Sequence, residues 1–327
     1  MPWKLLIKLS RIIRYDNEVE VNKMEDAKSV ELMQKNASRI QREQKERKKN
    51  RGIVLSYFKR IIKYISLGNL SYAIYALKRA CKVAITKVDD NNDKVAKSTK
   101  VIDEDEKIVI YSVLFGNYDE LKEPLYITPN CDYYVLTNQE VPKKSVWKKY
   151  SIEDFEDRVK GFSNLEKARF FKTHPQILFP EYKYSMFIDA NIQMVTDMRP
   201  VFAQLEENFI AIHNQTGRDC VYQEATEIIV IGKANKKEVK HQMNVYKKEG
   251  FPEHYGLFRT CVVVREHNDS NCVKLMELWW DEIQKYTKRD QLSFTYALWK
   301  MGLDKKAVSN LGYDPRTNPR FIEGTHI

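Results

Sequence analysis

The sequence lacks three features that would each place it in a distinct class of protein. No apolar run reaches the roughly 20 residues of a membrane-spanning helix, and 31% of the 327 residues are charged. Lys8, Arg11 and Arg14 interrupt the apolar stretch at the N-terminus, so no signal peptide is predicted. The five cysteines are scattered and form no CxxC pair: Cys81, Cys131, Cys220, Cys261 and Cys272. This argues against a disulfide framework and a cysteine zinc site, and it suits a reducing, cytoplasmic compartment.

The charge of the chain is unevenly placed. Residues 1–100 hold 24 lysines and arginines against 11 aspartates and glutamates, a balance of +13, whereas the remainder holds 31 against 34, a balance of −3. The sequence thus predicts a nearly neutral body with a basic N-terminal extension, whose partner is a polyanion such as an anionic membrane surface.

The N-terminal extension repeats a basic amphipathic pattern. In residues 1–15, apolar side chains fall mostly on one helical face, and we expect the following residues to meet a lipid surface: Trp3, Lys4, Lys8, Arg11 and Arg14. A helix that docks on the protein itself is the alternative. Residues 16–51 are polar and predict a solvated helix, with a coiled-coil element as the alternative, and residues 53–66 and 70–86 repeat the basic amphipathic pattern. We expect an anionic membrane surface to bind through residues 1–86, with the protein peripheral on the inner face of the cell membrane.

A polar, Asn/Asp-rich stretch at 89–100 reads as a linker and predicts two parts, a basic amphipathic helical extension and linker at 1–104 and a folded domain at 105–327. Short apolar runs predict strands at 108–115, 132–137, 184–188, 210–213, 228–231 and 261–264. Helices are expected from Ser163 to before Pro175, with Ser163 and Glu166 forming a capping box, and at 272–286 and 290–301. This alternation predicts an α/β fold with a mostly parallel, Rossmann-like sheet flanked by helices.

The strongest single motif is Asp189-Ala190-Asn191, directly after the apolar strand at 184–188. A carboxylate at the end of a buried strand needs a partner. Oxygen side chains at positions i and i+2 of an extended segment can hold a hard divalent cation, Mn²⁺ or Mg²⁺, together with water and phosphate oxygens. A β-turn that uses Asp and Asn as turn formers is the alternative. In open α/β sheets the ligand crevice lies beyond the carboxyl ends of the strands, which makes residues 115–119, 137–138 and 189–191 expected neighbours.

Several stretches, in conserved order along the chain, make the sequence from 107 to about 301 resemble the TOD1/MUCI70 glycosyltransferase-like family. The matching stretches are 111–119, 132–138, 168–174, 184–191, 218–225, 249–252, 256–257, 264–268, 279–282 and 289–294. The resemblance implies a fold similar to GT-A glycosyltransferases, with Asp189-x-Asn191 as the metal-binding motif. It favours a UDP-sugar as the donor. Asn138 stands where relatives often carry an aspartate.

A nucleotide-sugar donor leaves with a charged diphosphate, which a metal and cationic side chains must neutralise. Arg169 and Lys172 lie three residues apart on one helix and could reach it, or could form a solvated helix face. The expected donor-binding residues are Phe115, Gly116, Tyr118, Asp119, Asn138, Arg169, Lys172 and Asp189. The expected metal ligands are Asp189, Asn191, His326 and His213, with His254 also considered.

If the reaction inverts the anomeric carbon, it needs a base. Asp290, at a predicted helix start, is the leading candidate, with an N-cap role as the alternative. Glu224 is the second candidate. Trp279 and Trp280 could line a sugar cleft, but at helical spacing only one of them is expected to face the core, and that one is expected to pack there.

These features favour a metal-dependent glycosyltransferase with a cell-envelope polysaccharide or lipid-linked glycan as acceptor, with a homo-oligomer as a further expectation. A metal-dependent lipid amide hydrolase of the ceramide type is an alternative, which the resemblance suggests through a plant relative. A non-enzymatic membrane- or nucleic-acid-binding module is another. No nucleic acid is expected, because no RNA-binding or helix-turn-helix signature accompanies the basic extension.

Overall fold

The computed structural model describes residues 26–46, 52–66, 68, 70, 72–74, 76–77, 101–103, 105–215, 217–312 and 314–325. The predicted membrane residues at positions 3–14 lie outside this range, as do His326 and Cys81. Cys131, Cys220, Cys261 and Cys272 all carry free thiols. Among the helices described, none combines the length and apolar character needed to cross a bilayer.

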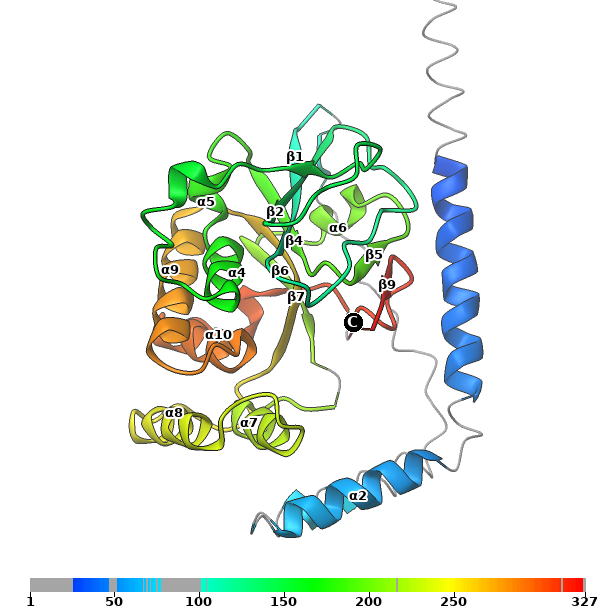
Figure 1. Cartoon of the computed structure of the whole chain (residues 1–327). Helices are drawn as coiled ribbons and strands as arrows, with labels where there is room; N and C mark the ends of the chain where they lie inside the picture. The colour runs from blue at the N-terminus through cyan, green and yellow to red at the C-terminus, as the bar shows by residue number, and fades with distance from the viewer. Residues whose placement is uncertain are drawn as a thin grey trace, which may run out of the picture.

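A seven-stranded sheet forms the centre of the molecule (Figure 1). Its spatial order is β3-β2-β1-β4-β7-β6-β8, and only β7 runs antiparallel to its neighbours. The strands are β1 (Ile108–Leu114), β2 (Cys131–Thr137), β3 (Lys148–Lys149), β4 (Tyr184–Ile188), β6 (Ile210–Asn214), β7 (Phe258–Glu266) and β8 (Ser309–Asn310). A separate pair joins β5 (Ile192–Met194) to β9 (Phe321–Glu323). The predicted α/β fold with a mostly parallel sheet is confirmed.

Alternation along β1 shows why the sheet is buried on both faces. Val109, Tyr111 and Val113 belong to one apolar cluster, and Ile108 and Ile110 belong to another. Successive side chains of a strand point to opposite faces, so a continuous apolar run needs cover on both sides.

Helices provide that cover. One face packs against α4 (Asn164–Thr173), α5 (Pro175–Leu178), α9 (Ser270–Lys285) and α10 (Asp290–Lys300), which lie together in Figure 1. The other face packs against α6 (Arg199–Ala203) and the β5–β9 pair. Further helices are α7 (Val221–Val230), α8 (Lys236–Lys248) and α2 (Gly52–Ser66), with 3₁₀ turns η2 (Glu153–Phe155) and η3 (Lys305–Ala307).

The strand predicted at 228–231 is wrong, because these residues end helix α7. Val221, Ala225 and Ile228 recur at helical spacing and pack in one apolar cluster with α8 and α10. A four-residue apolar run cannot by its composition alone be told from a helical segment. The other strands and helices predicted between residues 105 and 327 are present with boundaries shifted by at most a few residues.

Part of the N-terminal extension lies against the body. Residues 26–46 are helical, and Asn36 Nδ2 donates hydrogen bonds to the carbonyls of Pro319 (2.8 Å) and Phe321 (3.0 Å). Ser29, near the start of this helix, hydrogen-bonds Thr196. The helix stands beside β9 in Figure 1. This segment is therefore partly buried rather than fully solvated as predicted, while the domain boundary near residue 105 stays a prediction.

The capping box at the start of α4 sets where this helix begins. Glu166 N donates to Ser163 Oγ, and the Glu166 carboxylate accepts from Ser163 N (3.0 Å). Both predicted partners are thus confirmed. We expect Ser163→Ala to lower the free energy of unfolding by about 1 kcal/mol, because an orphan amide of the first turn loses its acceptor. Chemical denaturation measures this, with Ser151→Ala as a control outside any helix cap; equal stability of the Ser163→Ala variant and the wild type would contradict the assignment.

Candidate active site

A cleft of about 660 Å³ opens at the carboxyl ends of β1 and β4. It is where parallel strands of an open α/β sheet are expected to present a ligand site. Nine of the predicted site residues line it: Phe115, Tyr118, Asp119, Arg169, Lys172, Asp189, Asn191, Glu224 and Asp290. An adjacent cavity of about 380 Å³ shares Leu114 and Asp119 with it and is also lined by Asn117, Thr137 and Gln139.

The Asp189–Asn191 motif forms a turn. Ile192 N donates to the Asp189 carbonyl (2.9 Å), so the expectation of an extended segment is wrong and the turn alternative describes the backbone. The two motif side chains nevertheless both line the cleft. Asn191 Nδ2 donates to the Gly324 carbonyl (3.0 Å) and Gly324 N donates to the Asn191 carbonyl (2.8 Å). These bonds hold the C-terminal segment directly beside the motif.

The Asp189 carboxylate is the unusual group of the cleft. It accepts no hydrogen bond from the residues that the structure describes. Burial raises its pKa, and the nearby charges of Lys172 and Arg169 oppose this rise only in part. A half-buried carboxylate without a bonded partner among the described residues, on the wall of a cleft, is suited to receive a cation.

The chemistry of the donor set fits a hard divalent cation. Asp189 and Asn191 offer oxygen ligands, and the carboxylate of Glu323 lines the same wall. Within the described ranges, no three His, Cys, Asp or Glu side chains form a group able to hold a metal. The set therefore fits an ion that keeps water or phosphate oxygens among its ligands, as Mg²⁺ and Mn²⁺ sites on phosphate substrates do.

The predicted histidine ligands lie elsewhere or outside the described residues. His213 is fully buried on β6, away from the cleft wall, where burial lowers its pKa to about 3 and Nε2 contacts Asn318 (3.2 Å). The structure thus contradicts its grouping with Asp189. His254 is exposed and pairs with Asp219 (2.7 Å). His326 follows Gly324 by two residues in the sequence and stays a prediction.

Lys172 and Arg169 converge on a single carboxylate. Lys172 Nζ lies 2.5 Å and Arg169 Nη1 lies 3.4 Å from Asp290 Oδ2, which also accepts a hydrogen bond from Thr260 (2.9 Å). Lys172 is only 1% exposed, and its ammonium lies 4.7 Å from the Phe187 ring centroid. The alternative of a solvated helix face is therefore wrong for Lys172.

Asp290 is clamped rather than free. It is the first residue of α10, after the N-cap position at Arg289. Burial acts to raise its pKa, but Arg169 and Lys172 outweigh burial and hold the pKa well below its usual range. Such a carboxylate is a weak base. Glu224, the other candidate, accepts from Arg218 (2.7 Å), so both candidates are paired with cations and their catalytic role stays a prediction.

The loop after β1 has a defined turn. Gly116 adopts φ +76°, and a Cβ there would lie 3.1 Å from Asn164 Nδ2. Asn138 Oδ1 accepts from Gly116 N (3.0 Å), and Gln139 Nε2 donates to the Gly116 carbonyl. Gly116 and Asn138 do not line the main cleft. They instead hold the loop that carries Phe115, Tyr118 and Asp119 onto its wall.

Trp279 and Trp280 both pack in the core and neither lines the cleft, so the expectation that only one of them would face the core is wrong. The sequence-based list missed two cations that do line it, Arg289 and Lys233. Their side chains form no hydrogen bond or ion pair with the described part of the chain. Arg289 directly precedes Asp290, a predicted site residue, and this position could have identified it as a residue of the cleft. Lys233 follows residues 228–231, which were predicted as a strand but end helix α7, so the sequence did not place Lys233 at the cleft.

Loss of Asp290 leaves the buried Lys172 ammonium without its closest counter-ion. We expect Asp290→Asn to lower the free energy of unfolding at pH 7 by about 3 kcal/mol. A carboxylate with a lowered native pKa stabilises the fold above its unfolded pKa of about 4 and loses this contribution as the pH falls further. The difference between wild type and variant should therefore shrink below about pH 4. Denaturant unfolding at several pH values tests this, with the exposed Asp281→Asn as control; equal stability of Asp290→Asn and wild type at pH 7 would refute the ion cluster.

Comparison with known proteins gives one family. Residues 166–324 match the family model described as TOD1/MUCI70, glycosyltransferase-like domain. A protein of Arabidopsis thaliana described as probable hexosyltransferase MUCI70 is 27% identical over 224 residues, which span 58% of this chain and 36% of that protein. The chain thus covers about a third of the length of this relative.

Three solved structures show weak similarity. Mouse xyloside xylosyltransferase 1 aligns at 10% identity and TM-score 0.37, over 63% of this chain and 84% of that one. The mannosyltransferase Ktr4p of S. cerevisiae aligns at 15% identity and TM-score 0.36, over 67% of this chain and 72% of that one. The galactosyltransferase LgtC aligns at 11% identity and TM-score 0.35, over 62% of this chain and 72% of that one. All three TM-scores lie below 0.5, and the fold assignment rests instead on the strand order and directions of this chain.

The family match begins later than the resemblance in the sequence and extends further, to the C-terminal segment that contacts Asn191. It contains the Asp189–Asn191 turn, the clamped Asp290 and the two unpaired cations of the cleft. Residues 166–324, just under half of this chain, are thus similar to the TOD1/MUCI70 glycosyltransferase-like domain family.

Proposed function

We propose that the protein is a metal-dependent glycosyltransferase that transfers a hexosyl or related group from a nucleotide sugar to a glycan acceptor. One observation carries the proposal: a half-buried Asp189 carboxylate, without a hydrogen-bond donor among the described residues, faces a cleft at the carboxyl end of β4, within the segment that matches this family. The description of the Arabidopsis relative as a probable hexosyltransferase supports the reaction class. The lipid amide hydrolase and the non-enzymatic binding module have no specific observation in their favour.

The donor would lie along the cleft with its diphosphate at Asp189 and Asn191. These two residues would hold a divalent cation, Mn²⁺ or Mg²⁺, which neutralises charge on the leaving diphosphate. His326 remains a proposed third ligand, because the Gly324–Asn191 hydrogen bonds fix the chain two residues before it. The nucleoside, for which family resemblance favours uridine, would extend toward Tyr118, Asp119 and the adjacent smaller cavity.

Arg289 and Lys233 would supply the positive charge that the diphosphate needs. Lys172 and Arg169 are already engaged with Asp290, so they act on the cleft mainly through their field. The two cations without a partner in the described structure, by contrast, have donors free to bind phosphate oxygens. Lys172, Arg169 and Asp290 would then hold the cleft floor in place while the donor binds.

Nucleotide binding tests the proposal. We expect one nucleoside diphosphate, with UDP first, to raise the thermal midpoint only when Mn²⁺ is present. At a hundredfold excess over the dissociation constant the added stability is about 2.7 kcal/mol. Asp189→Ala should abolish the shift, whereas the exposed Asp157→Ala should keep it. A panel of UDP, GDP and CMP and their sugars that shifts neither wild type nor control would refute the proposed donor class.

The diphosphate contact has its own test. Because charge-assisted hydrogen bonds contribute about 1.5–3 kcal/mol, Arg289→Ala and Lys233→Ala should each weaken UDP binding about tenfold or more. Binding of uridine, which has no phosphate, should change little. Isothermal titration with both ligands measures the difference, and Lys160→Ala serves as a matched surface control. Equal loss for uridine and UDP would show that these cations act on the fold and not on the phosphates.

A further inference from the structure

Exposed apolar side chains gather on one part of the surface. Phe58, Ile62 and Ile65 of α2 are 53–59% exposed, and Leu70, Ile74 and Leu77 of the next helical segment are 48–64% exposed. The other large apolar side chains exposed in the described residues are scattered over several elements. Apolar surface that gathers in this way marks an interaction site. We call these six residues the α2 surface.

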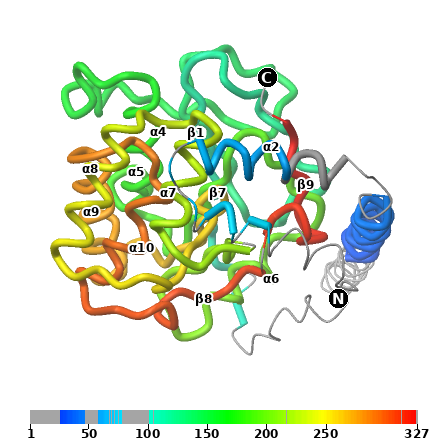
Figure 2. Tube along the Cα trace, turned by 90° about the horizontal axis from the view of Figure 1, so that it is seen from below, coloured from blue at the N-terminus to red at the C-terminus, as the bar shows by residue number. Residues whose placement is uncertain are grey.

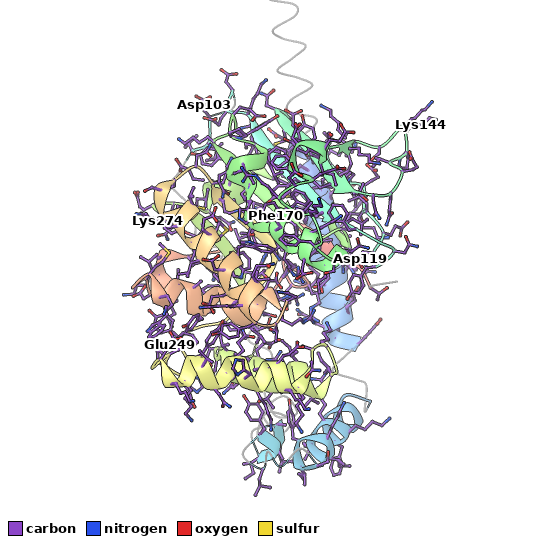
Figure 3. All side chains as sticks on the ribbon, turned by 60° about the vertical axis from the view of Figure 1, so that its left-hand side comes forward. Asp103, Asp119, Lys144, Phe170, Glu249 and Lys274 are labelled. Carbon is purple, nitrogen blue, oxygen red and sulfur yellow. The ribbon has the colours of Figure 1, made fainter. Side chains whose placement is uncertain are left out.

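The α2 surface is the outer face of two helical segments whose inner faces are packed. Each set of three recurs at i, i+4 and i+7, which places it along one side of a helix. On the opposite side, Tyr64, Ala73 and Ala76 pack on Val230 at the end of α7. Figure 2 shows α2 lying across α7 from below, and Figure 3 shows it beneath α8, whose C-terminal end is marked by Glu249. The apolar residues are thus left outside a docked helix.

Buried polar contacts fix α2 in this position. Tyr64 donates a hydrogen bond to Glu227 on α7, and Arg60 pairs with the same carboxylate (3.1 Å). The neighbouring Glu224 of α7 lines the cleft, as do Ile228 and Ile231. Both α2 and α7 therefore lie between the α2 surface and the candidate active site, a separation of about 20 Å at roughly 10 Å for each helix layer.

The charge around the α2 surface selects an anionic occupant. Lys59 and Lys63 are exposed beside the apolar residues. The sequence from 52 to 86 holds six lysines and arginines and no aspartate or glutamate. A second copy of this chain would bring like charges together. Cations beside an apolar helix face are typical of helices that lie in the plane of a lipid interface.

We propose that the α2 surface binds an anionic lipid bilayer, with α2 parallel to the membrane plane. The apolar side chains enter the boundary between headgroups and acyl chains, and Lys59 and Lys63 meet lipid phosphates. The cleft then lies two helix layers, α2 and α7, above the membrane. This placement favours a lipid-linked glycan in the same bilayer as the acceptor. The choice of acceptor rests on the proposed glycosyltransferase activity, whereas the membrane contact does not.

Vesicle binding of the full chain tests the proposal. Wild type should co-sediment with vesicles of phosphatidylcholine containing 30% phosphatidylglycerol, and bind vesicles of phosphatidylcholine alone at least tenfold more weakly. Since each lysine near an anionic surface changes affinity about fivefold, Lys59→Glu/Lys63→Glu should lower binding by about 25-fold or more. Ile62→Ser/Ile74→Ser should lower it at least tenfold. Leu125→Ser/Ile127→Ser, which alters exposed apolar residues elsewhere, should bind as wild type does.

Thermal midpoints of all four proteins establish that the variants are folded; both α2 pairs replace exposed side chains. If both α2 variants bind vesicles as wild type does, the surface is not the membrane contact and the proposal fails. The proposal also fails if the wild-type protein does not bind vesicles and instead sediments as a dimer, and Ile62→Ser/Ile74→Ser converts this dimer to a monomer. Asp189→Ala should retain vesicle binding. If the protein binds vesicles but no nucleotide raises its thermal midpoint, the proposed donor chemistry is refuted and the membrane contact of the α2 surface is still supported.

Discussion

The contact between Lys172 and Asp290 holds the candidate active site together. It joins α4 to α10, and Thr260 of β7 and Arg169 complete the set around one carboxylate oxygen. A buried ammonium or carboxylate alone would be costly, so each group requires the other. The two helices and the central strand must therefore meet at this point for the fold to be stable. The cleft forms above that junction.

The same ion cluster shapes the electrostatics of the cleft. Asp189 lies near two cations that are already committed to Asp290, so it receives only part of the stabilisation that its charge needs. A divalent cation with phosphate oxygens as further ligands would supply the remainder. The C-terminal segment matters for the same reason, because Gly324 binds Asn191 and closes the chain around the motif. Because Arg169 and Lys172 are paired with the Asp290 carboxylate, the Asp189 carboxylate is left available for a ligand.

Local sequence patterns predicted much of the fold and part of the site. The apolar runs at β1 and β4 and the Ser163–Glu166 capping box are local signals, and the structure contains all of them. The motif at Asp189 could be placed because it follows a buried strand. In contrast, the run at 228–231 was too short to show its helical period. The cations paired with Asp290 are distant in the sequence, and Arg218, which pairs with Glu224, lies in the loop before α7, so no local pattern revealed that both carboxylates are paired with cations. The approach of Gly324 to Asn191 depends on β5–β9 pairing across more than a hundred residues.

Binding of Mn²⁺, followed by electron paramagnetic resonance, determines whether Asp189 is a metal ligand of the cleft. Free Mn²⁺ gives a sharp six-line signal that weakens when the ion binds a protein site. The account predicts that wild-type protein removes this signal in the presence of UDP, and that Asp189→Ala, although folded, does not. An undiminished signal with wild type, or an equal loss with Asp189→Ala, would contradict the assignment of this carboxylate as the metal ligand of the cleft.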